Sequence, residues 1–521
     1  MDRRDFVGLA LLSTTPVAIG AINSASVLEA GALEQQARMR KGSLTSEGLA
    51  KAYLARIAAV DRAGPRINSI IELNPDALAQ AKALDRERAA GKLRGPLHGC
   101  CVLLKDNIAT GDKMRTSAGS LALAEVRAVR DASIVARLRD AGAVILGKTN
   151  LSEWANMRGV RSTSGWSGRG GLTRNPYALT RSCSGSSSGS GAAMAASLAT
   201  FAVGTETDGS IVSPASACGV VGIKPTVGLV SRSGIIPISH TQDTAGPMAR
   251  SVADAALLLA AMAGADPRDA ATAGAKITDY AAALDKDGLK GMRLGVARNY
   301  FGRHPKTDAL MERALKVLVA QGAELIDVRV PNTDKIGNSE LQVLLYEFKP
   351  GLAAYFAEYA PHAPVRDMAS VIAFNQRERV RELPYFGQEH MERSQAKGGL
   401  DSQEYLDALA TCRRYSRAEG IDQILLEHRL DALVAPTAGP AWLIDLVNGD
   451  SSGGSFSSPA AVAGYPHVTV PAGTVHGMPV GLSFVGTAWS EAALIRMAYS
   501  FEQARGEFTK PAFGRDAKDV A

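Results

Sequence analysis

The sequence predicts an α/β fold with a mixed or largely parallel sheet, and three observations support this. Amphipathic helical segments alternate with short apolar segments of strand length along much of the chain. Of the 521 residues, 46% are hydrophobic and 21% are charged, a globular composition that excludes intrinsic disorder. The 52 glycines are more than an average chain carries. They follow no period of three, which excludes a collagen-like repeat.

Before residue 150, the patterns predict helices over 44–63, 76–90 and 131–141 and buried strands over 97–104 and 143–146. The first helix places Leu49, Tyr53 and Ile57 on one stripe, and Thr45 has the side chain of an N-cap. Helix and strand therefore alternate from the start of the globular part, as in an α/β domain.

After a Gly/Ser-rich tract over 159–246, the alternation returns. It predicts strands near 292–297, 324–328, 432–435 and 480–485 and helices near 308–321 and 490–505. The interval 338–430 is more charged and mostly helical in pattern, and we interpret it as a helical insertion or cap over the core. Without repeats or a clean linker, residues 26–521 are expected to form a single domain.

The N-terminus resembles an export signal. Arg3 and Arg4 precede Phe6, and a mildly apolar run over 7–21 follows without an acidic residue. This order resembles a twin-arginine signal peptide over residues 1–25 and predicts a periplasmic or secreted protein; a merely basic N-terminus would leave the protein in the cytoplasm. No later segment offers 18 uninterrupted apolar residues, so we expect no stable membrane insertion.

Charge, cysteine and histidine patterns narrow the function classes. The net charge of +6 is spread over interspersed basic and acidic residues, which argues against nucleic-acid binding. The five cysteines lack CxxC spacing and form no disulfide framework, although one bridge stays open for an exported protein. The histidines include no HxxxH pair, so no metal site is expected.

The Gly/Ser-rich tract contains two segments suited to binding negative charge. Residues 181–191 lead a Gly/Ser loop into an alanine-rich helix, and residues 204–210 (GTETDGS) form a second loop. Successive backbone amides in such loops can hold a phosphate or a tetrahedral oxyanion. A P-loop is unsupported, because no GKS or GKT follows. A GxSxG nucleophile elbow at Ser187 is also unsupported, since no strand pattern precedes it.

A serine nucleophile needs a base, and Lys105 is the candidate. It ends the apolar run Cys100–Leu104 and precedes Asp106 and Asn107. Desolvation at a strand end would lower its pKa from about 10.4 toward neutrality. Taken by itself, a lysine after a strand is more often a surface charge.

Several blocks in order resemble the amidase signature family, and most closely the peptide amidases. They are GPLHGCCVLLKDN (95–107), GKTNLSEWAN (147–156), SGSSSGSG (184–191), GTETDGSI (204–211), GVVGIKPTVGLVSRSGIIPIS (219–239) and DTAGPMARSVADAA (243–256). The resemblance covers roughly residues 44–505. It implies a central mixed sheet covered by helices on both faces.

The resemblance also implies a mechanism and a site. Ser210 matches the nucleophile that forms an acyl-enzyme, Ser186 the proton-relaying serine after a cis peptide bond from Gly185, and Lys105 the neutral base. The amides of Thr207, Asp208, Gly209 and Ser210 match the oxyanion hole. No cofactor or metal is implied. Asp208 and Val212 stand where the family usually has glycine and arginine, which leaves the support of this loop open.

Three functions remain open at this stage. The first is a stand-alone hydrolase of small-molecule or peptide amides, working as a monomer or homodimer. The second is the glutaminase-like subunit of a transfer-RNA amidotransferase, which the export signal argues against. The third is a fatty-acid or aryl amide hydrolase. In the helical interval, Tyr346, Phe348, Tyr355 and Phe356 either shape the acyl pocket or pack in the core.

Overall fold

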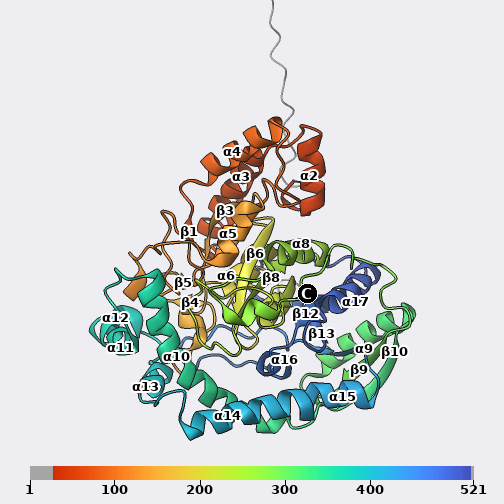
Figure 1. The fold of residues 1–521 in the computed structure, drawn as a ribbon. Coiled ribbons are helices and arrows are strands. Elements are labelled where there is room, and N and C mark those ends of the chain that lie inside the picture. Colours follow the sequence, from red (N-terminus) through yellow and green to blue (C-terminus); the bar gives the residue numbers. More distant parts are fainter. Residues whose placement is uncertain (1–26, 518–521) are drawn as a thin grey trace, which may run out of the picture.

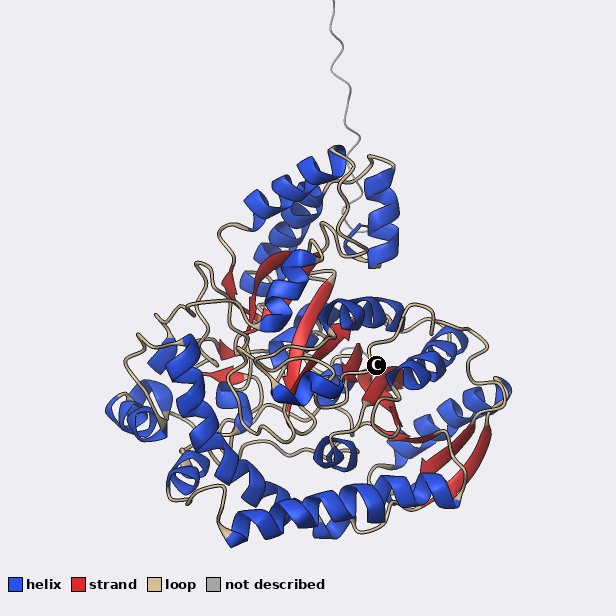
Figure 2. Cartoon of the chain, viewed as in Figure 1, coloured by secondary structure: helices blue, strands red, loops and turns tan. Residues whose placement is uncertain are grey.

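The computed structural model describes residues 27–517, so the predicted signal over 1–25 lies outside the described residues. A large mixed sheet crosses the molecule, with helices on both of its faces (Figures 1 and 2). The strands are β1 (Ile70–Leu73), β2 (Cys101–Lys105), β3 (Val144–Thr149), β6 (Phe201–Glu206), β7 (Val221–Lys224), β8 (Thr244–Ala249), β9 (Arg293–Ala297), β10 (Glu324–Val328), β11 (Ala432–Pro436), β12 (His467–Val475) and β13 (Met478–Val485).

The 11 strands follow the order β1-β3-β2-β6-β8-β7-β12-β13-β11-β9-β10, and a separate two-stranded ribbon pairs β4 (Trp166–Ser167) with β5 (Gly171–Leu172). The pairs β3–β2, β2–β6, β11–β9 and β9–β10 are parallel and the others antiparallel. The predicted α/β class with a mixed sheet is confirmed.

Alternating side chains of the central strands enter two separate cores. In β2, Val102 and Leu104 join one cluster, whereas Cys101 and Leu103 join the other. Because successive side chains of a strand point to opposite faces, each core covers one face of the sheet. Both faces are therefore buried under helices, as in α/β folds generally.

The helices of the first half are α2 (Ala32–Arg40), α3 (Ser46–Arg56), α4 (Ala77–Ala89), α5 (Ser133–Asp140), α6 (Ser188–Ala195), α7 (Val212–Ala217) and α8 (Val252–Met262). The predicted helices over 44–63, 76–90 and 131–141 are confirmed. Thr45 caps α3 by accepting a hydrogen bond from Gly48 N at 2.9 Å. A π-helical turn, η1 (Ile57–Arg62), continues α3.

The remaining helices are α9 (Pro305–Ala320), α10 (Gly337–Tyr359), α11 (Met368–Arg377), α12 (Arg379–Glu382), α13 (Glu389–Gln395), α14 (Gln403–Arg413), α15 (Asp422–Glu427), α16 (Ser458–Ala463) and α17 (Glu491–Ala504). Short 3₁₀ or π turns are η2 (Leu121–Leu123), η3 (Glu153–Asn156), η4 (Ala270–Gly274), η5 (Arg298–Tyr300), η6 (Thr333–Lys335) and η7 (Arg414–Ile421). Helices α10 to α15 occupy the interval for which the sequence predicts a helical insertion, and they run along the left and lower edge of the view (Figure 1).

Candidate active site

Lys105 ends β2 next to the end of β6. The two strands are parallel neighbours, with Leu104 opposite Val203, so their carboxyl ends meet at one edge of the sheet. The Lys105 side-chain nitrogen Nζ lies 2.7 Å from Ser186 Oγ, 2.9 Å from Thr205 Oγ1 and 3.1 Å from Thr205 O. The side chain is 0% exposed. Lys105 is therefore a buried lysine in contact with a serine, and the alternative of a surface charge is wrong.

Burial lowers the pKa of Lys105 from 10.5 to about 7, although the nearby carboxyls of Glu206 and Asp243 act in the opposite direction. A lysine with such a pKa is partly neutral at neutral pH and can accept a proton. Burial also lowers the pKa of Lys148 and Lys224, each to about 8. Within residues 27–517, neither of these two lysines bonds to a serine: their Nζ atoms donate to backbone carbonyls and, in Lys148, also to a threonine.

Ser186 lies in the loop that leads into α6, and the peptide bond between Gly185 and Ser186 is cis. The next two serines hold this loop in place. Ser187 Oγ accepts a hydrogen bond from Thr205 N at 3.2 Å and donates one to Thr205 O at 3.1 Å, and Ser188 Oγ donates to Ser184 O at 2.5 Å. The preceding strand, β5, ends at Leu172, so the strand that a nucleophile elbow requires is missing here.

Ser210 lies between β6 and α7 and is 8% exposed. The N–H of Ser187 donates to the carbonyl of Ser210 at 3.1 Å, which ties the two serine-bearing loops together. Within residues 27–517, no hydrogen bond joins the hydroxyls of Ser186 and Ser210. The structure thus brings Lys105 and Ser186 into direct contact and places Ser210 in the adjacent loop.

The backbone amides of residues 207–210 are free. None of the four N–H groups donates a hydrogen bond to the part of the chain that the structure describes. Gly209 turns the chain at a φ of +76°, where a Cβ atom would lie 2.9 Å from Ser457 Oγ, so both the conformation and the contact favour glycine. Four consecutive free amides beside a glycine turn are typical of loops that bind a negatively charged oxygen.

Side chains rather than backbone bonds support this loop. Glu206 Oε2 accepts hydrogen bonds from the amides of Ile211 and Val212 at 2.7 and 3.0 Å. Thr207 Oγ1 donates to Asp243 Oδ1 at 2.6 Å. These supporting roles were not predicted from the sequence. The signal available was the run of polar residues 205–208, but β6, which ends inside this run at Glu206, was not predicted.

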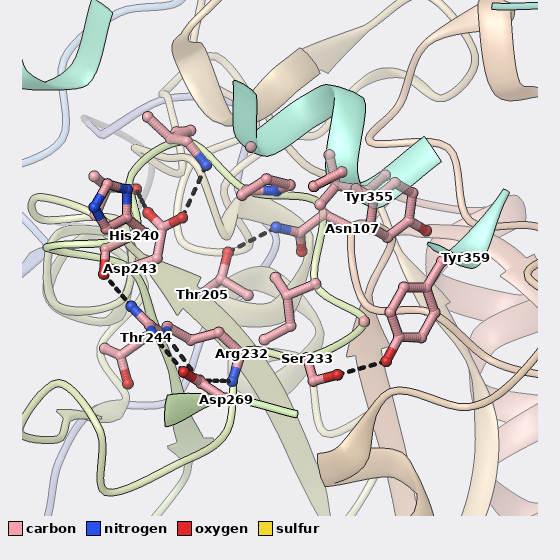
Figure 3. A pocket seen from close by; sticks show the side chains of 18 of the residues that line it. Asn107, Thr205, Arg232, Ser233, His240, Asp243, Thr244, Asp269, Tyr355 and Tyr359 are labelled. Carbon is pink, nitrogen blue, oxygen red and sulfur yellow. Dashed lines mark hydrogen bonds and ion pairs between the residues drawn. The ribbon is translucent and has the colours of Figure 1, made fainter. Parts of the chain in front are cut away.

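A cavity of about 270 Å³ borders this region on the side of residues 205–207. Residues 235–238 and the insertion residues Tyr355 and Tyr359 also line it. Figure 3 shows Asn107 and Thr205 joined on its wall, where Asn107 Nδ2 donates to Thr205 Oγ1 at 3.0 Å. Of the four aromatic residues singled out in the helical interval, Tyr355 lines this cavity, whereas Tyr346, Phe348 and Phe356 are buried and do not line it.

Other sequence expectations concern cysteines, metals and membranes. All five cysteines are free, so the disulfide that the sequence left open does not form. Among residues 27–517, no group of three or more His, Cys, Asp or Glu side chains could hold a metal ion. No helix in the same part of the chain is long and apolar enough to cross a bilayer.

Comparison with known proteins supports an amide hydrolase. The chain belongs to the amidase family, whose model, described as Amidase, matches residues 49–495. It is 55% identical to the native peptide amidase from Stenotrophomonas maltophilia, with a TM-score of 0.88 over 93% of this chain and 99% of that one. A structure of a peptide amidase in complex with the competitive inhibitor chymostatin gives a TM-score of 0.91 at the same identity and coverage.

More distant relatives cover the chain almost as fully. A probable amidase of Arabidopsis thaliana is 42% identical over 92% of this chain and 90% of its own length. A glutamyl-tRNA(Gln) amidotransferase subunit of Geobacter metallireducens is 36% identical over 91% of this chain and 97% of its own. The predicted fold, a central mixed sheet with helices on both faces, is confirmed by the structural neighbours.

Proposed function

We propose that the chain hydrolyses a carboxylic amide to the acid and ammonia through Ser210, Ser186 and Lys105. Ser210 Oγ attacks the carbonyl carbon, and its proton passes through Ser186 Oγ to the neutral Nζ of Lys105. The amides of residues 207–210 donate hydrogen bonds to the tetrahedral oxyanion. The proton then returns through Ser186 to the leaving nitrogen, the C–N bond breaks, and ammonia departs. Water hydrolyses the remaining ester with the same base.

The contact between Lys105 and Ser186 is the observation that carries this proposal. A 2.7 Å hydrogen bond joins a serine hydroxyl to a lysine whose pKa burial lowers to about 7. A base is most useful when its pKa lies near the working pH. The missing hydrogen bond between Ser186 and Ser210 is compatible with the relay, because catalytic hydrogen bonds often tighten only in the complex with substrate.

Single substitutions test the three roles. Ser210→Ala, Ser186→Ala and Lys105→Ala are each expected to abolish ammonia release while the protein keeps its circular dichroism spectrum. Ser197→Ala is the control, since Ser197 lies beyond the other end of α6 and its hydroxyl donates to Glu29 Oε1, and it should keep activity. Mass spectrometry of rapidly quenched wild-type enzyme should find the acyl group on a peptide containing Ser210. Wild-type turnover by Ser210→Ala would overturn the proposal.

We further propose C-terminal peptide amides as the substrate class. The 55% identity over almost the full length of two peptide amidase structures supports this choice over fatty-acid or aryl amides. Ammonia release should be measured on matched panels of peptide amides, fatty amides and aryl amides. A preference for peptide amides in kcat/KM is expected, and a preference for either other class would reassign the substrate.

A second candidate is the glutaminase subunit of a transfer-RNA amidotransferase. The 36% identity with the Geobacter metallireducens amidotransferase protein over 91% of this chain favours it, and the higher identity with the peptide amidases argues against it. The purified chain alone should discriminate the two. Hydrolysis of a peptide amide without partner proteins supports the stand-alone hydrolase, whereas glutamine hydrolysis that requires added partner proteins supports the second candidate.

We also propose that the chain is exported. The support is the order of Arg3, Arg4 and Phe6 ahead of the apolar run. Cells producing the Arg3→Lys, Arg4→Lys double variant should retain the protein in the cytoplasm on fractionation. An unchanged extracytoplasmic yield would overturn a twin-arginine route.

A further inference from the structure

The loop that carries the free amides contains a carboxylate with an incomplete set of partners. Asp208 Oδ2 accepts a hydrogen bond from Ser458 Oγ, in α16, at 2.6 Å. Asp208 Oδ1 is buried and accepts no hydrogen bond within residues 27–517. An unpaired buried carboxylate oxygen is costly. It would also repel the oxyanion proposed to form beside the neighbouring amides.

Glu340 of α10 is a buried second carboxyl group in contact with Asp208. It is 8% exposed, and its Oε1 accepts a hydrogen bond from Gln242 Nε2 at 2.9 Å. The same Gln242 nitrogen lies 3.4 Å from the carbonyl of Thr207. Burial, together with the adjacent charge of Asp208, holds the pKa of Glu340 well above its usual value. Glu340 therefore holds a proton more readily than an exposed glutamate does.

We propose that Glu340 and Asp208 share one proton and that this pair, with Gln242 and Ser458, positions the free amides of residues 207–210 for the oxyanion. The inference rests on the proposed function of that site. The protonated carboxyl of Glu340 donates a hydrogen bond to the unpaired oxygen Oδ1 of Asp208. The buried pair therefore carries one negative charge instead of two. Glu340 touches no reacting atom and is a positioning residue.

The geometry explains why this loop needs support from side chains. Amides that are reserved for an oxyanion cannot also hold their own loop in a ladder or a helix. The loop is held instead by side chains from three separate elements: Glu340 from α10, Ser458 from α16, and Gln242 from the segment before β8. Family members with the usual glycine at position 208 have no side chain there, so they cannot make these contacts.

Other titratable groups lie near this pair, and their effect on a pH profile must be distinguished from that of the pair. They are Cys412 on α14, Tyr300 on η5, Glu206 at the end of β6 and Lys224 on β7. Burial raises the pKa of Cys412 to about 12 and also raises that of Tyr300, so both stay neutral over the useful range. The pKa of Lys224 is lowered to about 8, so its titration is present in wild type and variants alike.

The test compares Glu340→Gln with Glu340→Ala in kcat and KM as a function of pH. Since the shared proton is lost as pH rises through the raised pKa of Glu340, wild-type kcat should fall on the alkaline side. Glu340→Ala should lower kcat at pH 7 by about 10- to 100-fold, the effect of a misplaced oxyanion donor, with KM changed far less. Glu340→Gln keeps a donor that cannot titrate, so it should restore most of kcat and remove that alkaline fall.

Glu347→Gln is the matched control, because Glu347 is another buried carboxylate of α10 that bonds to Ser239 and Tyr405 instead of the loop. It should keep the alkaline fall of the wild type. The proposal is overturned if Glu340→Gln shows the wild-type alkaline fall, or if Glu340→Ala changes KM alone. Should Glu340→Ala fail to fold, the pH dependence of kcat in Glu340→Gln alone tests the proposal. Failure of the proposed function is recognised separately, as turnover by Ser210→Ala.

Discussion

The pKa of Lys105 sets the acidic side of the pH profile. Only the neutral amine can accept the proton of Ser186, so kcat/KM should rise with pH through about 7, the pKa that burial gives Lys105. With that pKa, about a tenth of the lysine is neutral at pH 6, about half at pH 7 and about nine tenths at pH 8. With the ordinary pKa of 10.5, less than about one part in a thousand would be neutral at pH 7.

Asn107→Asp perturbs this pKa in a known direction. Asn107 Nδ2 and Lys105 Nζ both bond to Thr205 Oγ1, at 3.0 and 2.9 Å, so a carboxylate at position 107 would lie within about 6 Å of the ammonium group. An opposite charge at that distance favours the protonated lysine and raises its pKa by about 1 to 2 units. The neutral fraction at pH 7 then falls by about 5- to 50-fold.

The assay is kcat/KM for one amide between pH 5 and pH 10, a range that spans about 2 to 3 units on either side of the wild-type pKa of about 7. For Asn107→Asp, the acidic limb should move up by the same 1 to 2 units, and kcat/KM should approach that of the wild type measured at the same high pH. Asn107→Ala is the control, because it removes the same hydrogen bond without adding a charge and should leave the limb near pH 7. A limb that stays at the wild-type pH in Asn107→Asp, with activity lowered equally at every pH, would refute the assignment of Lys105 as the titrating base.

Three further substitutions test the packing that positions the site. Gly209→Ala should reduce kcat by at least about 10-fold with a smaller loss of stability, because its φ of +76° and the nearby Ser457 Oγ both disfavour a Cβ; wild-type kinetics would contradict the role of this turn. Phe201→Ala in the fully buried start of β6 should lower the free energy of unfolding by about 3–5 kcal/mol, measured by urea denaturation, and a loss below about 1 kcal/mol would show that the site can repack. Thr45→Ala removes the cap of α3 and should cost about 1 kcal/mol in the same measurement without changing kcat, and a cost near zero would mean that water replaces the cap.

The sequence predicted those elements whose pattern of apolar residues is regular. The helix that becomes α3, with its cap at Thr45, and the strand that becomes β9 follow from periodicity and a short apolar run. The prediction missed β6 and β8, and it treated residues 204–206 as loop although they end β6. These two central strands, FAVGTE and TAGPMA, are rich in small residues and lie within the Gly/Ser-rich tract.

Close packing explains why those strands look like loops in sequence. At Gly204, a Cβ atom would lie 2.8 Å from Ser187 Oγ, and at Gly246 it would lie 2.0 Å from Ile223 O. Neither approach leaves room for a side chain. The glycines that weaken the strand signal are therefore the ones that let the loop before α6 approach β6 and let β7 approach β8. Strand propensity fails here because tertiary contacts select the residue.

The same limit applies to the candidate site. Lys105, Ser186 and Ser210 lie in recognisable local patterns, and their residue types point to a chemistry. Glu340 and Ser458, in contrast, reach the loop from helices far along the chain, and nothing local to either residue marks that contact. Their role depends on which helix packs where, which one sequence does not reveal.

The helical interval therefore has a second role besides lining a cavity. Tyr355 and Tyr359 of α10 contribute to the cavity beside residues 205–207, while Glu340, near the start of the same helix, contacts the loop of free amides. Because one helix carries both sets of contacts, a change that moves α10 to admit a larger substrate also moves the group that positions the oxyanion amides. Substitutions near Tyr355 and Tyr359 should thus alter substrate specificity. They should leave kcat unchanged only if the contact between Glu340 and Asp208 is kept.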